Sequence, residues 1–289
     1  MGDDLCTRLV RENLVCVWSE QGPRSYNEDT VLLYARHGML VAGVFDGHGG
    51  SDVSRFLVPT FEALLDKMAA GGLPVADASW CAAIESLFDD ADRLMAQSLS
   101  SEQYRHTGST ASMAFVVPDK HGRAAGRVFF ANTRDSRTSL YSQSEAAVVH
   151  ETSDHTLDTF EETDRIKRAG GWGSPAGSGG AHSEGGRRDG TLATSRSFGD
   201  YDAGPGLIYS PDVTGPHFLD VFAGPHFLIS ATDGLHDVLS SDELQHALRA
   251  LCSAAVPSCT SARTVATALW RRAKTKGLVD NTTVVVVQL

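Results

Sequence analysis

The sequence lacks several features that mark whole classes of protein. Among its 289 residues, no run reaches the roughly 18 apolar positions of a membrane-spanning helix. Its first residues lack the basic segment and apolar core of a secretory signal. Basic residues number 25 against 36 acidic ones, and no run of lysine and arginine offers a basic face. We therefore expect no membrane span and no nucleic-acid partner. No period of about 20 to 50 residues repeats, which argues against solenoids and propellers.

Cysteine is also scarce. The chain has five cysteines, an odd number, and no pair has Cys-x-x-Cys spacing. We interpret them as free thiols in a reducing compartment. Cys6 stands where a serine or threonine would complete a myristoylation signal. We expect a cytoplasmic protein, with the nucleus as an alternative; the oligomeric state stays open, with a monomer as the simplest expectation.

Strand-like and helix-like patterns alternate along the whole chain, and the helices come in pairs. This order favours antiparallel sheets covered by helices over a βαβ array, in one domain spanning residues 1–289. Nine glycines within residues 170–190 indicate a mobile surface flap. The predicted strands are 14–18, 30–34, 39–45, 112–117, 128–132, 138–141, 227–231 and 282–288. The predicted helices are 52–68, 79–99, 160–169, 241–252 and 262–274.

Four acidic residues share a position at a strand end or a tight turn: Glu28, Asp46, Asp233 and Asp280. Asp46 and Asp233 each follow an apolar strand, and a carboxylate there loses hydration unless something offsets the loss. Hard divalent cations do so, and a set of oxygen ligands suits Mg²⁺ or Mn²⁺. The alternative for each Asp-Gly pair taken alone is a hairpin turn. The metal interpretation therefore depends on the whole set.

A larger set of motifs occurs in order along the chain. It comprises Arg24…Glu28-Asp29, Asp46-Gly47-His48-Gly49-Gly50, Gly108-Ser109-Thr110-Ala111, Asp135-Ser136-Arg137, Ser195-Arg196-Ser197-Phe198-Gly199-Asp200, Asp233-Gly234-Leu235 and Asp280-Asn281-Thr282-Thr283. This set resembles the metal-dependent protein serine/threonine phosphatases of the PP2C (PPM) type, over residues 16 to 289. The resemblance implies an α+β fold, a β-sandwich of two antiparallel sheets flanked by pairs of helices in α-β-β-α layers.

The resemblance also implies a binuclear Mn²⁺ or Mg²⁺ centre. By this likeness Asp46 bridges both ions, Glu28 and the Gly47 carbonyl bind one ion, and Asp233 and Asp280 bind the other. Two further residues follow from the same likeness. Asp29 contacts the ions through bound water instead of coordinating them directly, and Asp135 resembles the ligand of a third, weaker ion.

The reaction implied by the resemblance is hydrolysis of phosphoserine and phosphothreonine in phosphoproteins by a metal-activated water, without a phosphoenzyme. His48 takes the role of general acid for the poor alkoxide leaving group. The planar fork of Arg24 binds the phosphate. Local alternatives are an ion pair between Arg24 and Glu28, and a surface role for His48. The Gly108 motif favours tight packing.

The chain departs from the family pattern at two positions. Arg134 stands where the family has glycine before Asp135, so a requirement for positive φ there would strain the backbone or remodel the loop. We expect Arg134 to weaken the third metal site or to project positive charge over the centre. His236 stands where the family usually has tryptophan, and we expect it to alter packing more than chemistry.

Two other functions compete with the phosphatase. One is an inactive or weak PP2C-like binding or regulatory module, which Arg134 favours; retention of so many clustered carboxylates argues against it. The other is a β-sandwich interaction domain whose Asp-Gly pairs are only turns.

Overall fold

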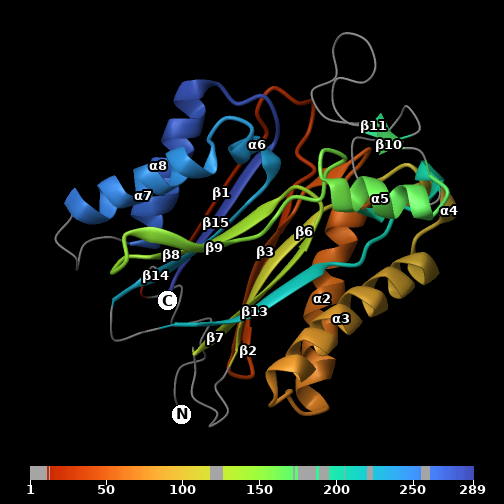
Figure 1. The fold of residues 1–289 in the computed structure, drawn as a ribbon, viewed down its shortest axis with the longest axis horizontal. Coiled ribbons are helices and arrows are strands. Elements are labelled where there is room, and N and C mark those ends of the chain that lie inside the picture. The colour runs from red at the N-terminus through yellow and green to blue at the C-terminus, as the bar shows by residue number, and fades with distance from the viewer. Residues whose placement is uncertain are drawn as a thin grey trace.

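Two antiparallel sheets pack face to face, and a pair of helices covers the outer side of each (Figure 1). The computed structural model describes residues 12, 14–117, 126–171, 173–174, 187–188, 195–204, 206–219, 224–254 and 261–289. The predicted α-β-β-α sandwich is confirmed. Cys16, Cys81 and Cys252 are free thiols; Cys6, Cys259 and most of the predicted flap lie outside the described residues.

The first sheet has the strand order β1-β15-β14-β8-β9. The valine run of its strand β15 is buried on both faces. Val284 and Val286 pack beneath the helices, whereas Val285 and Val287 face the other sheet. A covered central strand therefore carries a continuous β-branched run. The strands are β1 (Val15–Glu20), β8 (Arg137–Ser142), β9 (Ala147–Glu151), β14 (His226–Ala231) and β15 (Thr282–Gln288).

The second sheet has the order β13-β7-β6-β3-β2. Alternate residues of β3 divide between two cores: Val41 and Phe45 pack toward helices, and Leu40 and Val44 pack toward the first sheet. The period of two that a strand imposes thus produces both cores from one apolar run. The strands are β2 (Thr30–Arg36), β3 (Met39–Phe45), β6 (Ala111–Val117), β7 (Arg127–Thr133) and β13 (Asp212–Phe218).

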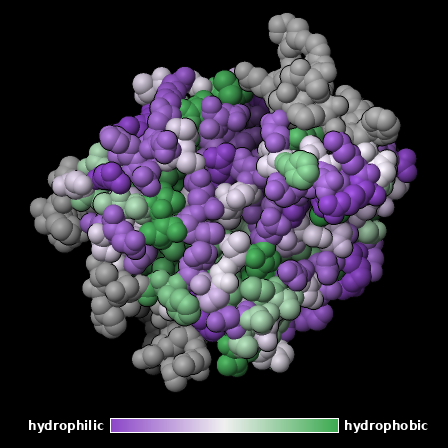
Figure 2. All heavy atoms as spheres, viewed as in Figure 1, coloured by the Kyte–Doolittle hydropathy of each residue, from purple (hydrophilic) through white to green (hydrophobic). Residues whose placement is uncertain are grey.

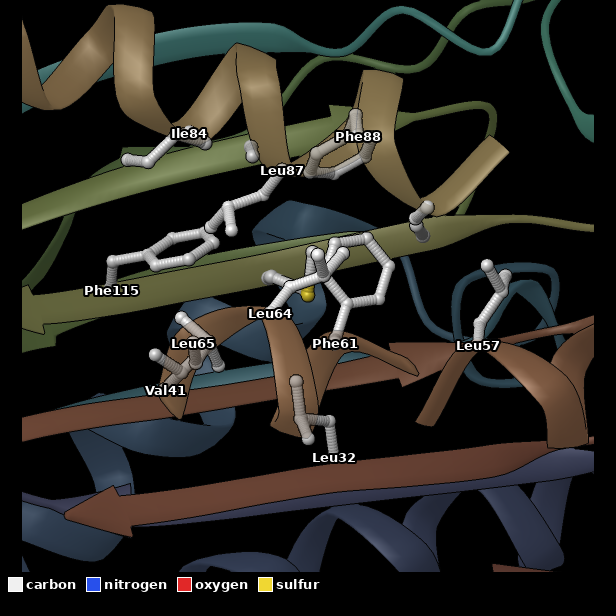
Figure 3. Close-up of a cluster of buried hydrophobic side chains, with 14 of the residues drawn as sticks. Leu32, Val41, Leu57, Phe61, Leu64, Leu65, Ile84, Leu87, Phe88 and Phe115 are labelled. Carbon is white, nitrogen blue, oxygen red and sulfur yellow. The ribbon is translucent and has the colours of Figure 1, made fainter. Parts of the chain in front are cut away.

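Four long helices form the outer layers (Figure 1). Helices α2 (Asp52–Ala70) and α3 (Asp77–Ser98) cover the second sheet, and α7 (Ser241–Ala254) and α8 (Ala262–Lys276) cover the first. Figure 3 shows Phe61 of α2 and Phe88 of α3 side by side between the two helices, and their ring centroids lie 5.3 Å apart. Within the described ranges, no helix has the length and apolar character that crossing a bilayer requires. Hydrophilic residues predominate on the face in Figure 2.

Several short elements join segments that are distant in sequence. A three-stranded sheet of order β12-β5-β4 combines β4 (Gly47–His48), β5 (Gly108–Ser109) and β12 (Phe198–Gly199). These two-residue strands have no periodicity that sequence patterns could reveal, so they were not predicted. The remaining short elements are α4 (Ser101–Arg105), α5 (Phe160–Arg168), α6 (Asp233–His236), β10 (Gly173–Ser174), β11 (Arg187–Arg188) and the 3-10 turn Tyr201–Ala203.

Candidate metal and catalytic centre

Asn281 fastens the loop after β1 to the start of β15. Its side-chain carbonyl accepts a hydrogen bond from the Glu28 backbone N–H at 3.0 Å. Its amide donates to the carbonyl oxygens of Gln21 at 2.7 Å and Tyr26 at 3.0 Å. Because Asn281 follows Asp280 directly, these three bonds bring Glu28 and Asp280 to the same end of the sandwich. The sequence motif contained Asn281, but its role as a clamp was not predicted.

Asp46 leaves the buried strand β3 at the same end. Its backbone N–H donates to the Thr110 hydroxyl at 2.9 Å, and its carbonyl accepts from the Thr110 N–H at 2.9 Å. The next residue, Gly47, packs so closely that an added Cβ would lie 2.7 Å from the Glu28 carbonyl oxygen and 2.7 Å from Ser54 Oγ. Glycine is therefore required at position 47, and Asp46-Gly47 connects β3 to β4 rather than forming a hairpin turn.

Asp233 begins the short helix α6 immediately beyond β14. The following Gly234 lies against β15, where an added Cβ would meet the Asn281 carbonyl oxygen at 2.1 Å. This second Asp-Gly pair therefore marks a strand-to-helix junction. The hairpin alternative is wrong for both pairs.

The carboxylates perturb one another strongly. Burial, followed by the charges of Asp233 and Asp29, holds the pKa of Asp46 well above its usual range. Burial raises the pKa of Asp233 to about 7, assisted by the charges of Asp135 and Asp237. Burial likewise raises the pKa of Asp29 to about 6, although Thr283 and Thr232 offset part of the effect by hydrogen bonding. These acids lie close enough to interact and lack sufficient positive charge among them.

The chemistry of this donor set fits a hard divalent cation. Buried oxygens of Asp29, Asp135 and Asp233 have no hydrogen-bond partner, and oxygen ligands are those that Mg²⁺ and Mn²⁺ prefer. In the part of the chain that the structure describes, no three or more His, Cys, Asp or Glu side chains already form a cluster that could hold an ion. A bound ion would therefore require the side chains to close around it.

His48 lies between an acid and a guanidinium. Its Nε2 is 2.5 Å from Asp200 Oδ2, and its Nδ1 is 2.5 Å from Arg134 Nη1. Because a guanidinium only donates hydrogen bonds, Nδ1 is the acceptor and Nε2 carries the proton toward Asp200. Asp200 is 3% exposed, against 24% for the His48 side chain, so it orients the imidazole from within. The motif contained Asp200, but its pairing with His48 was not predicted.

Gly108 makes this pairing possible. A Cβ at position 108 would lie 2.1 Å from Asp200 Oδ2 and 2.6 Å from His48 Nε2. The packing interpretation of the Gly108 motif is therefore correct, because β5 runs between β4 and β12 with no room for a side chain.

Arg24 lies at the rim of the centre. Its guanidinium forms an ion pair with Asp280, and its side chain is 56% exposed. The local alternative, a pair with Glu28, is not the one observed. Glu28 instead accepts a hydrogen bond from the Gly50 N–H. Arg24 is thus held beside the carboxylates with most of its side chain still facing solvent.

Arg134 and Asp135 follow β7, and Arg134 contacts His48 at Nδ1, the ring nitrogen that does not face Asp200. Arg134 has φ +83°, so the strain anticipated from the missing glycine is present, at roughly 1–3 kcal/mol. Its Nε lies 3.4 Å from Asp135 Oδ1. Arg137, farther along, is tied to Asp154 by hydrogen bonds of 2.6 and 2.7 Å, which anchors the loop at the start of β8.

His236 lies behind this loop at the end of α6. Burial, with a smaller contribution from the charge of Arg137, lowers its pKa to about 3. The imidazole is therefore neutral at physiological pH.

Comparisons with known proteins agree with this architecture. The protein-family model described as protein phosphatase 2C matches residues 27–282, a segment that begins after Arg24. A probable protein phosphatase 2C 8 of Oryza sativa subsp. japonica is 33% identical over 270 residues, covering 85% of this chain and 61% of the relative. A probable protein phosphatase 2C 59 of Arabidopsis thaliana is 31% identical, covering 93% and 78%. The chain thus spans about three fifths of the rice relative's length.

A solved phosphatase structure from Toxoplasma gondii superposes with a TM-score of 0.76, at 22% identity, over 94% of this chain and 91% of the other. At that identity the likeness supports the fold alone. The match of the family model across most of the residues, together with the two plant relatives, shows that this chain belongs to the protein phosphatase 2C family.

Proposed function

We propose that this chain hydrolyses phosphoserine and phosphothreonine in phosphoproteins and that the reaction depends on Mn²⁺ or Mg²⁺. Bound divalent cations supply an activated water and neutralise charge on the phosphoryl group. The ligands that we assign to two ions are oxygens from separate segments of the chain: Glu28, Asp46, the Gly47 carbonyl, Asp233 and Asp280. Asp29 is assigned to contacts through water, and Asp135 to a third, weaker ion.

One observation carries the proposal. Asp46 and Asp233, which are 187 positions apart in the chain, meet beside buried carboxylate oxygens that have no hydrogen-bond partner, and the pKa values of both rise, chiefly through burial. An arrangement of this kind lowers stability unless a cation binds, because burying unpaired carboxylates is unfavourable. Structural packing alone gives no reason to retain it.

The remaining roles belong to His48 and Arg24. Asp200 fixes the imidazole of His48 through Nε2, so Nδ1, which accepts from Arg134 in this structure, is the nitrogen that would carry a proton to the leaving serine or threonine alkoxide once Arg134 moves away from it. The exposed guanidinium of Arg24 can exchange Asp280 for a phosphate, since both partners accept hydrogen bonds from the same planar fork.

The test is hydrolysis of a phosphothreonine peptide by chelator-treated protein. We expect no turnover without metal, turnover on addition of Mn²⁺, and its loss in Asp46→Asn. The exposed Asp242 of α7 provides a matched control, and Asp242→Asn should behave as the parent chain. Turnover that persists after complete removal of metal would contradict the proposal; absence of turnover at every Mn²⁺ concentration would favour the binding module instead.

A further inference from the structure

The side chain of Arg134 lies close to three acids of the candidate centre, Asp46, Asp135 and Asp233, which we call the carboxylate cluster. It is 15% exposed, and its guanidinium touches His48 Nδ1 and approaches Asp135. Burial by itself lowers the pKa of Arg134, but the charges of Asp135, Asp46, Asp200 and Asp233 outweigh burial and raise it. The ion-pair partner of this guanidinium is thus Asp135, an acid of the candidate centre.

Hydrogen bonds to the backbone of Arg134 fix the direction in which its side chain leaves the loop. A long side chain rarely adopts φ +83°. The conformation is held by the Arg134 N–H, which donates to His155 Nδ1 at 3.1 Å, and by the Arg134 carbonyl, which accepts from the His155 N–H at 3.0 Å and from Asn132 Nδ2 at 3.0 Å. With the backbone fixed in this way, the guanidinium is directed toward His48 and Asp135.

A guanidinium and a divalent cation are both attracted to these carboxylates. Each offsets the lost hydration of the acids, and each repels the other at short range. The charge of Arg134 is covalently attached, so it is present at every metal concentration. It also occupies Nδ1 of His48, which leaves that nitrogen no free lone pair.

We infer that Arg134 is a tethered cation that stabilises the metal-free carboxylate cluster and competes with divalent ions for it. This inference rests on the proposed function and adds regulation by metal concentration to it. The chain binds Mn²⁺ more weakly than it would with an uncharged residue at this position, and it tolerates loss of metal better.

The test is calorimetric titration of chelator-treated protein with Mn²⁺, without substrate. Arg134→Met removes the charge and keeps a long side chain, and we expect its Mn²⁺ affinity to rise by roughly tenfold or more, the size of effect that one nearby like charge exerts. Arg134→Lys keeps the charge and should remain close to the parent chain. Arg55→Met removes a charge from the exposed face of α2 and serves as control for general electrostatics.

Thermal unfolding supplies a second readout that does not involve turnover. In chelator, Arg134→Met should melt below the parent chain, because Asp135 and the acids around it lose the guanidinium that lies beside them. Added Mn²⁺ should raise its melting temperature by more than it raises that of the parent. If Arg134→Met does not fold, Arg134→Gly provides the same titration, since glycine accepts positive φ without strain.

Equal Mn²⁺ affinity in the parent, Met and Lys forms would overturn the inference and leave the proposed function intact, because metal binding and metal-dependent hydrolysis would remain. An unchanged affinity with a raised KM for phosphopeptide would also overturn it, in favour of phosphate binding by Arg134. Absence of Mn²⁺ binding in every form would overturn both proposals.

Discussion

Asp233, which we propose as a metal ligand, carries a cost to the stability of the metal-free protein. Its pKa of about 7 lies above the ordinary value of 3.8 because the metal-free cluster is buried and negatively charged. A carboxyl whose pKa is raised by folding stabilises the fold when protonated, and this contribution is lost as the pH rises from about 4 to about 7. Cations and protons therefore compete for the same oxygens, and the affinity for metal should increase as the pH rises from about 4 to about 7.

Asp233→Asn should abolish high-affinity Mn²⁺ binding and yet stabilise the metal-free protein at pH 8. The amide does not ionise, so the penalty of a buried charge disappears; we expect a gain on the order of 2 kcal/mol. Urea unfolding in chelator at pH 5 and pH 8 measures this, with Asp242→Asn as the exposed control. Equal stability of the parent and Asp233→Asn at pH 8 would mean that the carboxylate is not strained by its neighbours.

The contact between His48 and Asp200 predicts how the loss of hydrolysis rate in a variant depends on the leaving group of the substrate. Asp200→Asn should preserve Mn²⁺ affinity but slow phosphothreonine peptides by about tenfold or more, because the imidazole loses its orienting acceptor. An aryl phosphate, whose leaving group needs little protonation, should be affected much less. His48→Ala should show the same selectivity with a larger effect. Equal losses on both substrates would contradict the general-acid role.

At the scale of elements, most of the long strands and helices were predictable because each carries a continuous apolar period. The edge strands β9 and β13 were missed: both are largely exposed or half-buried, and β13 contains Gly215-Pro216. Helix α2, predicted at 52–68, extends over Asp52–Ala70, and β15 has the predicted bounds. The strands β4, β5 and β12 have two residues each and depend on close backbone approach at Gly108. Their pairing arises from tertiary contacts, so local sequence gave no signal for it.

Helix α5 contributes the buried Glu162 to an ion cluster with two arginines. Glu162 accepts hydrogen bonds from Arg196 at 2.7 Å and Arg165 at 2.6 Å. Burial alone would raise its pKa, but these arginines prevail and hold the pKa at about 2, below the ordinary value of 4.5. Its stabilising effect is therefore present above about pH 4.5 and is lost as the pH falls toward 2.

Glu162→Gln should destabilise the chain by about 2–3 kcal/mol at pH 7, since two arginines lose their buried partner. The difference from the parent should shrink progressively between pH 4.5 and pH 2. Urea unfolding at several pH values measures the trend, and the neighbouring exposed Glu161→Gln is the matched control. A difference independent of pH over this range would exclude a charge effect.

At the scale of the whole molecule, the sequence motifs indicated which acids to examine, but not what surrounds them. The family motifs placed Glu28, Asp46, Asp233 and Asp280 together, and the structure brings their segments to one end of the sandwich. The clamp at Asn281 and the direction of the Arg134 side chain depend on contacts between residues far apart in the chain. Such contacts follow from the assembled fold and have no local sequence pattern.

The central claim is that this end of the sandwich is a divalent-metal centre. Anomalous diffraction from crystals of the chain grown or soaked in Mn²⁺ tests it most directly, because it locates each ion and the atoms around it. We predict two strong peaks with Asp46 between them, Glu28 and Gly47 at one and Asp233 and Asp280 at the other, and Arg134 displaced from His48. Full-occupancy density for the Arg134 guanidinium in its present place, with no anomalous peak among these acids at saturating Mn²⁺, would contradict the account.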